Sequence, residues 1–250
     1  MAASELSQGQ EVGRSGFARV TAMIYWVMVL TFMFALTTAP GWVVSLFLAP
    51  DPSNLPWFVA CLVPVGPALA ALVFAWRRRD IEGPDLAPAV RFWRGYRLNL
   101  VDVLRWWAPY LAVLAVGGFV ATNLHRLALP TGSVWFFIGL GAISALWAGH
   151  MIILTAAFSF RARDAARLGL YFFFHCFRAT LLYLSLLIIV FACTYFVGMW
   201  LPVALSAILA LFYVRAAGPM MTQVTAQFVA PDEVDDAPLV NDDEPGESEE

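Results

Sequence analysis

The chain has 250 residues, of which 61% are hydrophobic and only 13% are charged. Soluble domains carry about 45–50% apolar and about 25% charged residues, so this composition excludes an ordinary soluble domain. The net charge of −3 conceals an asymmetry, because ten of the 18 acidic residues lie between Asp232 and Glu250. The rest of the chain is basic, and every basic residue in it is an arginine.

The apolar residues are gathered in blocks long enough to cross the roughly 30 Å of hydrocarbon in a bilayer. They predict an all-α fold, a polytopic transmembrane helical bundle that forms a single transmembrane domain over residues 20–217. We expect the polar residues 1–19 that precede it to be a disordered N-terminus. Six spans are expected, at residues 20–48, 57–76, 107–124, 134–158, 179–199 and 200–214.

The second expected span contains three candidate helix-breaking residues, Pro64, Gly66 and Pro67. Proline has no N–H to donate within a helix, so it kinks or breaks the helix around it. Neighbouring helices can satisfy the backbone groups that such a break frees. In transporters, broken helices can surround a substrate site near the middle of the membrane.

The end of the chain holds two further features. The last two expected spans meet in a tight turn between Val197 and Pro202, so they could instead form one broken or re-entrant hairpin. The acidic residues 230–250 cannot bury enough apolar surface to fold alone, and we expect them to form a disordered cytoplasmic tail.

The arginines predict the orientation of the bundle in the membrane. The segments 77–105 and 161–178 carry seven and four arginines, and Arg14, Arg19 and Arg215 belong to the same side. The other side has only Arg126. Because cytoplasmic loops are enriched in positive charge, this distribution predicts that both termini lie in the cytoplasm.

Residues 91–106 have the pattern of an amphipathic helix in the cytoplasmic interface, with its aromatic side toward the lipid. Their polar residues are the candidate contacts with lipid or with a partner. The segment could serve as a linker that fixes the topology, or it could dock a cytoplasmic partner. The candidate residues are Arg91, Arg94, Arg97, Asn99 and Arg105.

Ionisable residues inside a membrane usually mark transport or catalysis. His150 is the one such residue within the expected spans, and it could relay a proton or bind a ligand. We expect it instead to bond a backbone carbonyl or a hydroxyl between helices. The sequence has no Walker A motif, no HExxH motif, no dinucleotide-binding glycine loop and no paired cysteines. We therefore expect no catalytic residues, no cofactor, no metal and no nucleic-acid partner.

The first half of the chain resembles the YesL family, a domain-of-unknown-function family of bacterial integral membrane proteins. The resemblance lies in PVGPALAA at 64–71, RRR at 77–79, DLAP at 85–88, FWRGYRLN at 92–99 and WAP at 107–109. It implies a multi-pass plasma membrane protein of a Gram-positive, actinobacterial cell. It also implies a link to carbohydrate uptake, with components of ABC-type sugar importers as partners. The acidic tail departs from the family pattern.

Three functions are open at this point. The leading hypothesis is a non-enzymatic protein that assists or regulates a transport system. The alternative is a small transporter in its own right, with the prolines of the second span placed around a site. A membrane enzyme is the third, although a flavin or nicotinamide enzyme should supply a phosphate-binding loop that this sequence lacks.

The expected topology can be tested by cysteine accessibility. In a variant without its native cysteines, Ser53→Cys and Ser133→Cys should both react with a membrane-impermeant thiol reagent added to intact cells, because both positions lie in the arginine-poor loops. Protection of both positions would contradict the expected orientation.

Overall fold

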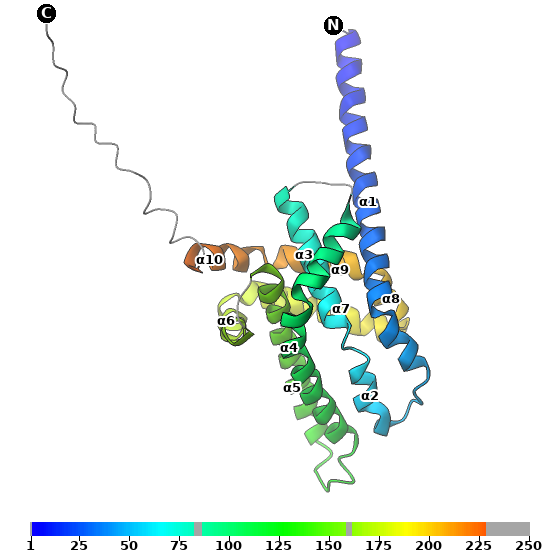
Figure 1. Cartoon of the computed structure of the whole chain (residues 1–250), viewed down its shortest axis with the longest axis vertical. Helices are drawn as coiled ribbons and strands as arrows, with labels where there is room; N and C mark the ends of the chain where they lie inside the picture. The colour runs from blue at the N-terminus through cyan, green and yellow to red at the C-terminus, as the bar shows by residue number, and fades with distance from the viewer. Residues whose placement is uncertain (1, 83–86, 159–161, 229–250) are drawn as a thin grey trace, which may run out of the picture.

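The computed structural model describes residues 2–82, 87–158 and 162–228, and all of its secondary structure is helical. The expected tail at 230–250 lies outside this range. Figure 1 shows the helices in chain order. They are α1 (Ala2–Leu46), the 3-10 helix η1 (Pro52–Asn54), α2 (Leu55–Ala60), α3 (Val65–Glu82), α4 (Pro88–Thr122), α5 (Ser133–Ala157), α6 (Ala162–His175), α7 (Phe177–Phe196), α8 (Trp200–Ala204), α9 (Ser206–Ala216) and α10 (Gly218–Phe228).

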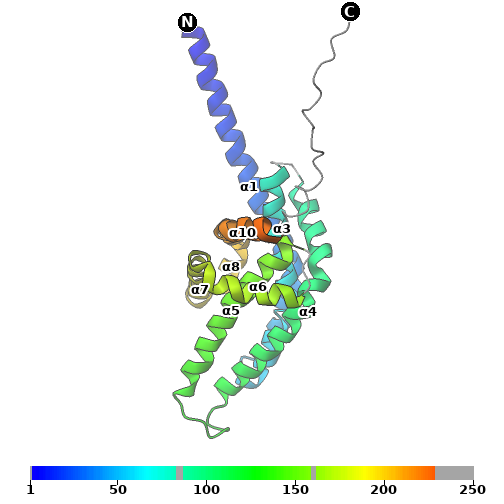
Figure 2. The ribbon, with the colours of Figure 1, turned by 90° about the vertical axis from the view of Figure 1, so that its left-hand side faces the viewer.

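Five helical segments in the described part of the chain are long and apolar enough to cross a membrane, and the fold is an all-α helical bundle. These segments lie in α1, in η1 to α3, in α4, in α5 and in α7. The segments do not run parallel to one another, because α1, α4 and α5 follow the long axis of the molecule while α7 lies across it (Figures 1 and 2). The helices α6 and α10 also lie across that axis.

The sixth expected span, at residues 200–214, is not one membrane-crossing helix. It is divided at Leu205 into the five-residue α8 and the eleven-residue α9. A crossing helix needs about 20 residues, so neither piece reaches across the hydrocarbon.

The observed bounds of two other helical segments differ from the expected ones. Residues 2–19 are helical and form the first turns of α1, because each residue added to an existing helix gains a hydrogen bond without a new nucleation cost. The expected interfacial helix at 91–106 and the expected span at 107–124 are one continuous helix, α4. The aromatic side of its first half faces protein, and Phe92 and Val103 are fully buried.

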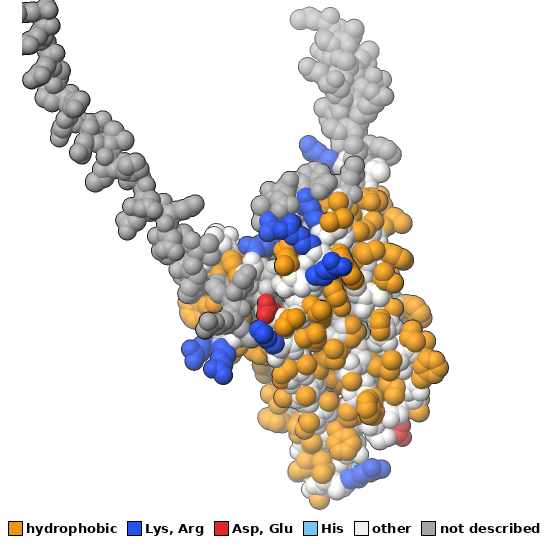
Figure 3. All heavy atoms as spheres, in the orientation of Figure 1, with side chains coloured by type: hydrophobic (Ala, Val, Ile, Leu, Met, Phe, Trp, Pro, Cys, Tyr) orange, Lys and Arg blue, Asp and Glu red, His pale blue; other side chains and the backbone are white. Residues whose placement is uncertain are grey.

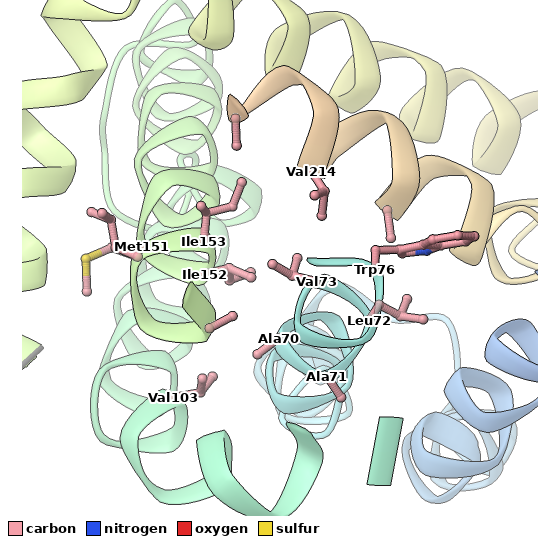
Figure 4. Packing of buried hydrophobic residues seen from close by; sticks show 14 of the residues in the cluster. Ala70, Ala71, Leu72, Val73, Trp76, Val103, Met151, Ile152, Ile153 and Val214 are labelled. Carbon is pink, nitrogen blue, oxygen red and sulfur yellow. The ribbon is translucent and has the colours of Figure 1, made fainter. Parts of the chain in front are cut away.

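The helix α3 is the centre of the core. It packs against α1, α4, α5 and α9, and most of its residues between Ala68 and Trp76 are buried. Small residues on a transmembrane helix allow neighbouring backbones to approach closely. Figure 4 shows Ala70, Ala71 and Val73 of α3 surrounded by side chains from several helices. The Trp76 indole N–H also donates to the carbonyl of Ala207 at 3.0 Å, which connects α3 to α9.

Two connections lie at the same end of the molecule. In the α1–η1 connection, the hydroxyl and the backbone N–H of Ser53 donate to Asp51 Oδ1 at 2.5 and 2.8 Å. These bonds lower the pKa of Asp51, and so does the positive charge of Arg126 in the α4–α5 connection. The charge of Arg126 therefore acts on Asp51 from the α4–α5 connection. Figure 3 shows most arginine side chains gathered away from this end.

The close packing of α3 on α4 can be tested at Gly66. A Cβ atom there would lie 2.7 Å from the Trp107 ring, so Gly66→Ala should lower the stability of the protein by about 1–3 kcal/mol through overpacking. Thermal unfolding in detergent measures the effect. The control is Gly139→Ala on α5, where a Cβ meets no atom within 4 Å and no loss is expected. Equal behaviour of the two variants would contradict this account.

Candidate functional site

Three exposed arginines and an exposed tryptophan lie on one side of α4, and we refer to Trp93, Arg94, Arg97 and Arg105 as the α4 arginine face. The guanidinium of Arg97 lies over the Trp93 ring at 5.2 Å. Arg105 Nη1 lies 3.4 Å from Asp102 Oδ1 in an exposed ion pair. Exposed pairs of this kind are worth little energy, so these side chains remain able to exchange partners. Exposed apolar residues lie between them, namely Val90, Leu98 and Val101.

The other two candidate residues of this helix are directed away from that face. Asn99 is buried, and its side-chain amide donates to the carbonyl of Gly95 at 2.8 Å, one helical turn earlier. Arg91 is partly buried, with its guanidinium 5.6 Å from the Trp26 ring of α1. The five candidates therefore form two groups, of which only three arginines share the exposed surface.

The candidate helix break lies between α2 and α3. The helix α2 ends at Ala60 and α3 begins at Val65. The break therefore includes Pro64, and Gly66 and Pro67 lie in the first turn of α3. The Trp107 indole N–H of α4 donates to the carbonyl of Leu62 at 3.1 Å. The same carbonyl also accepts from the backbone N–H of Val65 at 3.0 Å, so the indole bond is a second one that connects α4 to the break.

The helix α1 also packs against the break, at Cys61. A Cβ atom on Gly41 would lie 2.1 Å from the carbonyl oxygen of Cys61, so only glycine permits this contact. The break thus contacts α1 at Cys61 and Trp107 of α4 at Leu62. Its position is set by close packing as well as by the prolines.

A cavity of about 480 Å³ lies next to the break, and its volume is in the range of small-molecule sites. Leu62 and Val65 line it at the break, and side chains of α1, α4, α5, α7, α8 and α9 complete its wall. The lining is almost entirely apolar. Its polar groups include Ser206 Oγ, which is buried and has no partner within the described chain, and the Tyr213 hydroxyl, which donates to the carbonyl of Gly149.

His150 is fully buried at the contact between α5 and α7. Its Nδ1 lies 3.0 Å from the carbonyl of Leu146, and its Nε2 lies 3.4 Å from Thr180 Oγ1. A carbonyl can only accept, so Nδ1 donates to Leu146, while the Thr180 hydroxyl donates to the carbonyl of Phe173 at 3.0 Å. The ring also meets Tyr183 edge to face, with centroids 4.9 Å apart. This arrangement connects α5 and α7 through the imidazole.

Sequence reasoning missed Thr180 and Tyr183 as the neighbours of His150. Their spacing of three residues on α7 places them on one face of a helix, and this was the available signal. The pairing of that face with α5 depends on the turn at Cys176, where α6 ends and α7 begins. Burial raises the pKa of the Cys176 thiol.

Comparisons of the chain with protein families, with curated proteins and with solved structures find no match. The resemblance to the YesL family accordingly rests on the motifs in the first half of the sequence. The membrane-spanning helices and the geometry described above are the basis for any functional proposal.

The hydrogen bond at the helix break can be tested with Trp107→Phe. This change keeps an aromatic ring but removes the N–H that reaches Leu62, and the loss of this one hydrogen bond costs about 0.5–1.5 kcal/mol. Thermal unfolding in detergent should show the loss. Trp135→Phe on α5 is the control, because Trp135 is 74% exposed. A Trp107→Phe variant as stable as the control would show that the bond does not hold the break.

Proposed function

We propose that the chain is a non-enzymatic, multi-pass membrane protein that assists or regulates a transport system. In this proposal, the α4 arginine face is the surface that contacts the partner. The protein lies in the plasma membrane of a bacterium, of an actinobacterial cell by its resemblance, with both termini in the cytoplasm.

The observation that carries this proposal is that the aromatic side of α4 is buried in the bundle and the arginine-bearing side is exposed. A helix that only anchors the chain to lipid needs its aromatic side against the bilayer. Phe92 and Val103 on that side are instead fully buried within the bundle. The side left exposed carries Arg94, Arg97 and Arg105 with apolar residues between them. Arginine forks combined with apolar surface suit the recognition of another protein.

The identity of the partner comes from the resemblance to the YesL family. That resemblance points to carbohydrate uptake and to components of an ABC-type sugar importer. Such importers place loops and domains at the cytoplasmic side, which is the side where the arginine distribution locates the α4 arginine face.

A small transporter is the second candidate function, and one observation favours it. The cavity of about 480 Å³ lies directly beside the break between α2 and α3. Discontinuous helices beside a central cavity are a recurrent feature of secondary transporters. Uptake of a solute by the purified protein alone in proteoliposomes would favour this function over the accessory role.

The docking surface can be tested by replacing Arg94, Arg97 and Arg105 with lysine. The charge is kept, but the planar forks that make bidentate and stacking contacts are lost. We expect at least a several-fold reduction in the importer subunits that co-purify from native membranes, with expression and topology unchanged. Quantitative mass spectrometry of the purified complexes measures the reduction.

The matched control changes Arg163 and Arg167 to lysine. Both are exposed on α6 and belong to the same arginine-rich side, but neither is part of the α4 arginine face. This control should keep the normal amount of partner. A normal partner complement in the Arg94, Arg97 and Arg105 variant as well would contradict docking through the α4 arginine face.

A further inference from the structure

The cavity of about 480 Å³ is walled by one face each of α7 and α9, together with residues of other helices. Its lining residues fall at positions i, i+3, i+4 and i+7, counted from Tyr183 on α7 and from Ser206 on α9. Residues at these positions share one side of a helix. The two helices therefore turn a continuous face toward the same space. The rings of Tyr183 and Tyr213, one from each helix, are in contact with centroids 4.5 Å apart.

Two hydroxyl groups of this wall have no hydrogen-bond partner within the described part of the chain. They are the Tyr183 hydroxyl and Ser206 Oγ, and both residues are buried. The Tyr213 hydroxyl differs, because it donates to the carbonyl of Gly149. Buried hydroxyls are normally hydrogen-bonded, since a hydroxyl without a partner loses its hydration for no return. Tyr183 and Ser206 therefore supply donors that an occupant of the cavity can satisfy.

The rest of the lining limits what this occupant can be. None of the described residues that line the cavity is charged, so a charged molecule would lose its hydration there without gaining an ion pair. Water is also a poor occupant, because a buried water makes about three hydrogen bonds and most of this wall is apolar. A plain hydrocarbon would suit the apolar wall but would leave both hydroxyls unpaired. An uncharged, lipophilic molecule with an acceptor oxygen meets both conditions, since a hydroxyl hydrogen can turn toward an acceptor.

We propose that this cavity binds a neutral, lipophilic molecule that dissolves in the membrane and carries a carbonyl oxygen, with the hydroxyls of Tyr183 and Ser206 as the donors available to that oxygen. The apolar body of the molecule contacts the rest of the wall, which includes Leu146 of α5 and Trp107 of α4. The proposal assigns a class of ligand to the cavity whether or not the chain transports that ligand. No residue of the α4 arginine face lines the cavity, so this proposal and the docking proposal can fail separately.

The test uses methyl nonyl ketone as the probe and undecane as its matched control, because the two have the same number of carbon atoms and only the ketone has an oxygen. Each is added at the same mole fraction to a neutral detergent that holds the purified full-length protein. The ketone should raise the unfolding temperature more than undecane does, because a ligand that binds only the folded state stabilises it.

The variants Ser206→Ala and Tyr183→Phe each remove one hydroxyl and keep the rest of the side chain. Because neither hydroxyl has a partner in the described chain, the ligand-free variants should unfold at an unchanged or a higher temperature. Binding of the ketone should weaken by about two- to tenfold in at least one of them, and binding of undecane should not change. The matched controls are Ser185→Ala and Tyr195→Phe, which remove exposed hydroxyls from α7 and should bind the ketone normally.

The variant Ala210→Leu tests the location of the bound probe. Ala210 lines the cavity on α9, so a larger side chain there should occupy part of the space. Binding of the ketone and of undecane should both decrease. The hydroxyl variants serve if Ala210→Leu does not fold.

Three results would overturn the proposal. One is equal binding of the ketone and of undecane, which would make the cavity an apolar space without a preference for an oxygen. Another is normal ketone binding in both hydroxyl variants or in a folded Ala210→Leu variant, which would place the ketone elsewhere on the protein. The third is a lower unfolding temperature of both ligand-free hydroxyl variants, which would show that these hydroxyls already have partners inside the protein.

Discussion

The position of α3 depends on close contact between backbones, and much of the remaining structure depends on α3. Residues such as Ala70, Ala71 and Ala75 are small enough for α1, α4, α5 and α9 to approach this helix together. Because lipid tails are as apolar as a leucine side chain, packing of this kind and hydrogen bonds between helices must supply the stability of the bundle. The Trp76 bond to the Ala207 carbonyl is one such contribution, and it positions the short helix α9.

The same constraint explains how the break between α2 and α3 is tolerated inside an apolar segment. Unpaired backbone groups cost several kcal/mol in hydrocarbon, so irregular backbone must find partners in the protein. Leu62 contacts Trp107 of α4 and Cys61 contacts Gly41 of α1, so the break is packed against two neighbouring helices.

Because the aromatic side of α4 is buried, the arginines of this helix lie in two different environments, one exposed and one partly buried. Arg94 and Arg97 remain exposed, where their charge is screened and can exchange partners. Arg91 is partly buried, and its guanidinium lies over the Trp26 ring. The exposed arginines are therefore the ones that the proposed partner could contact.

The sequence alone determined that the chain is an all-α membrane protein, because long apolar blocks can satisfy their backbone groups in a bilayer only as helices. It also located the break near Pro64, since proline acts locally. Tertiary structure decided the continuity of α4, the division at Leu205 and the partners of His150 and Arg91. Helical periodicity shows which residues share a face, but an apolar face can meet either lipid or protein. Only the packing of the other helices distinguishes the two.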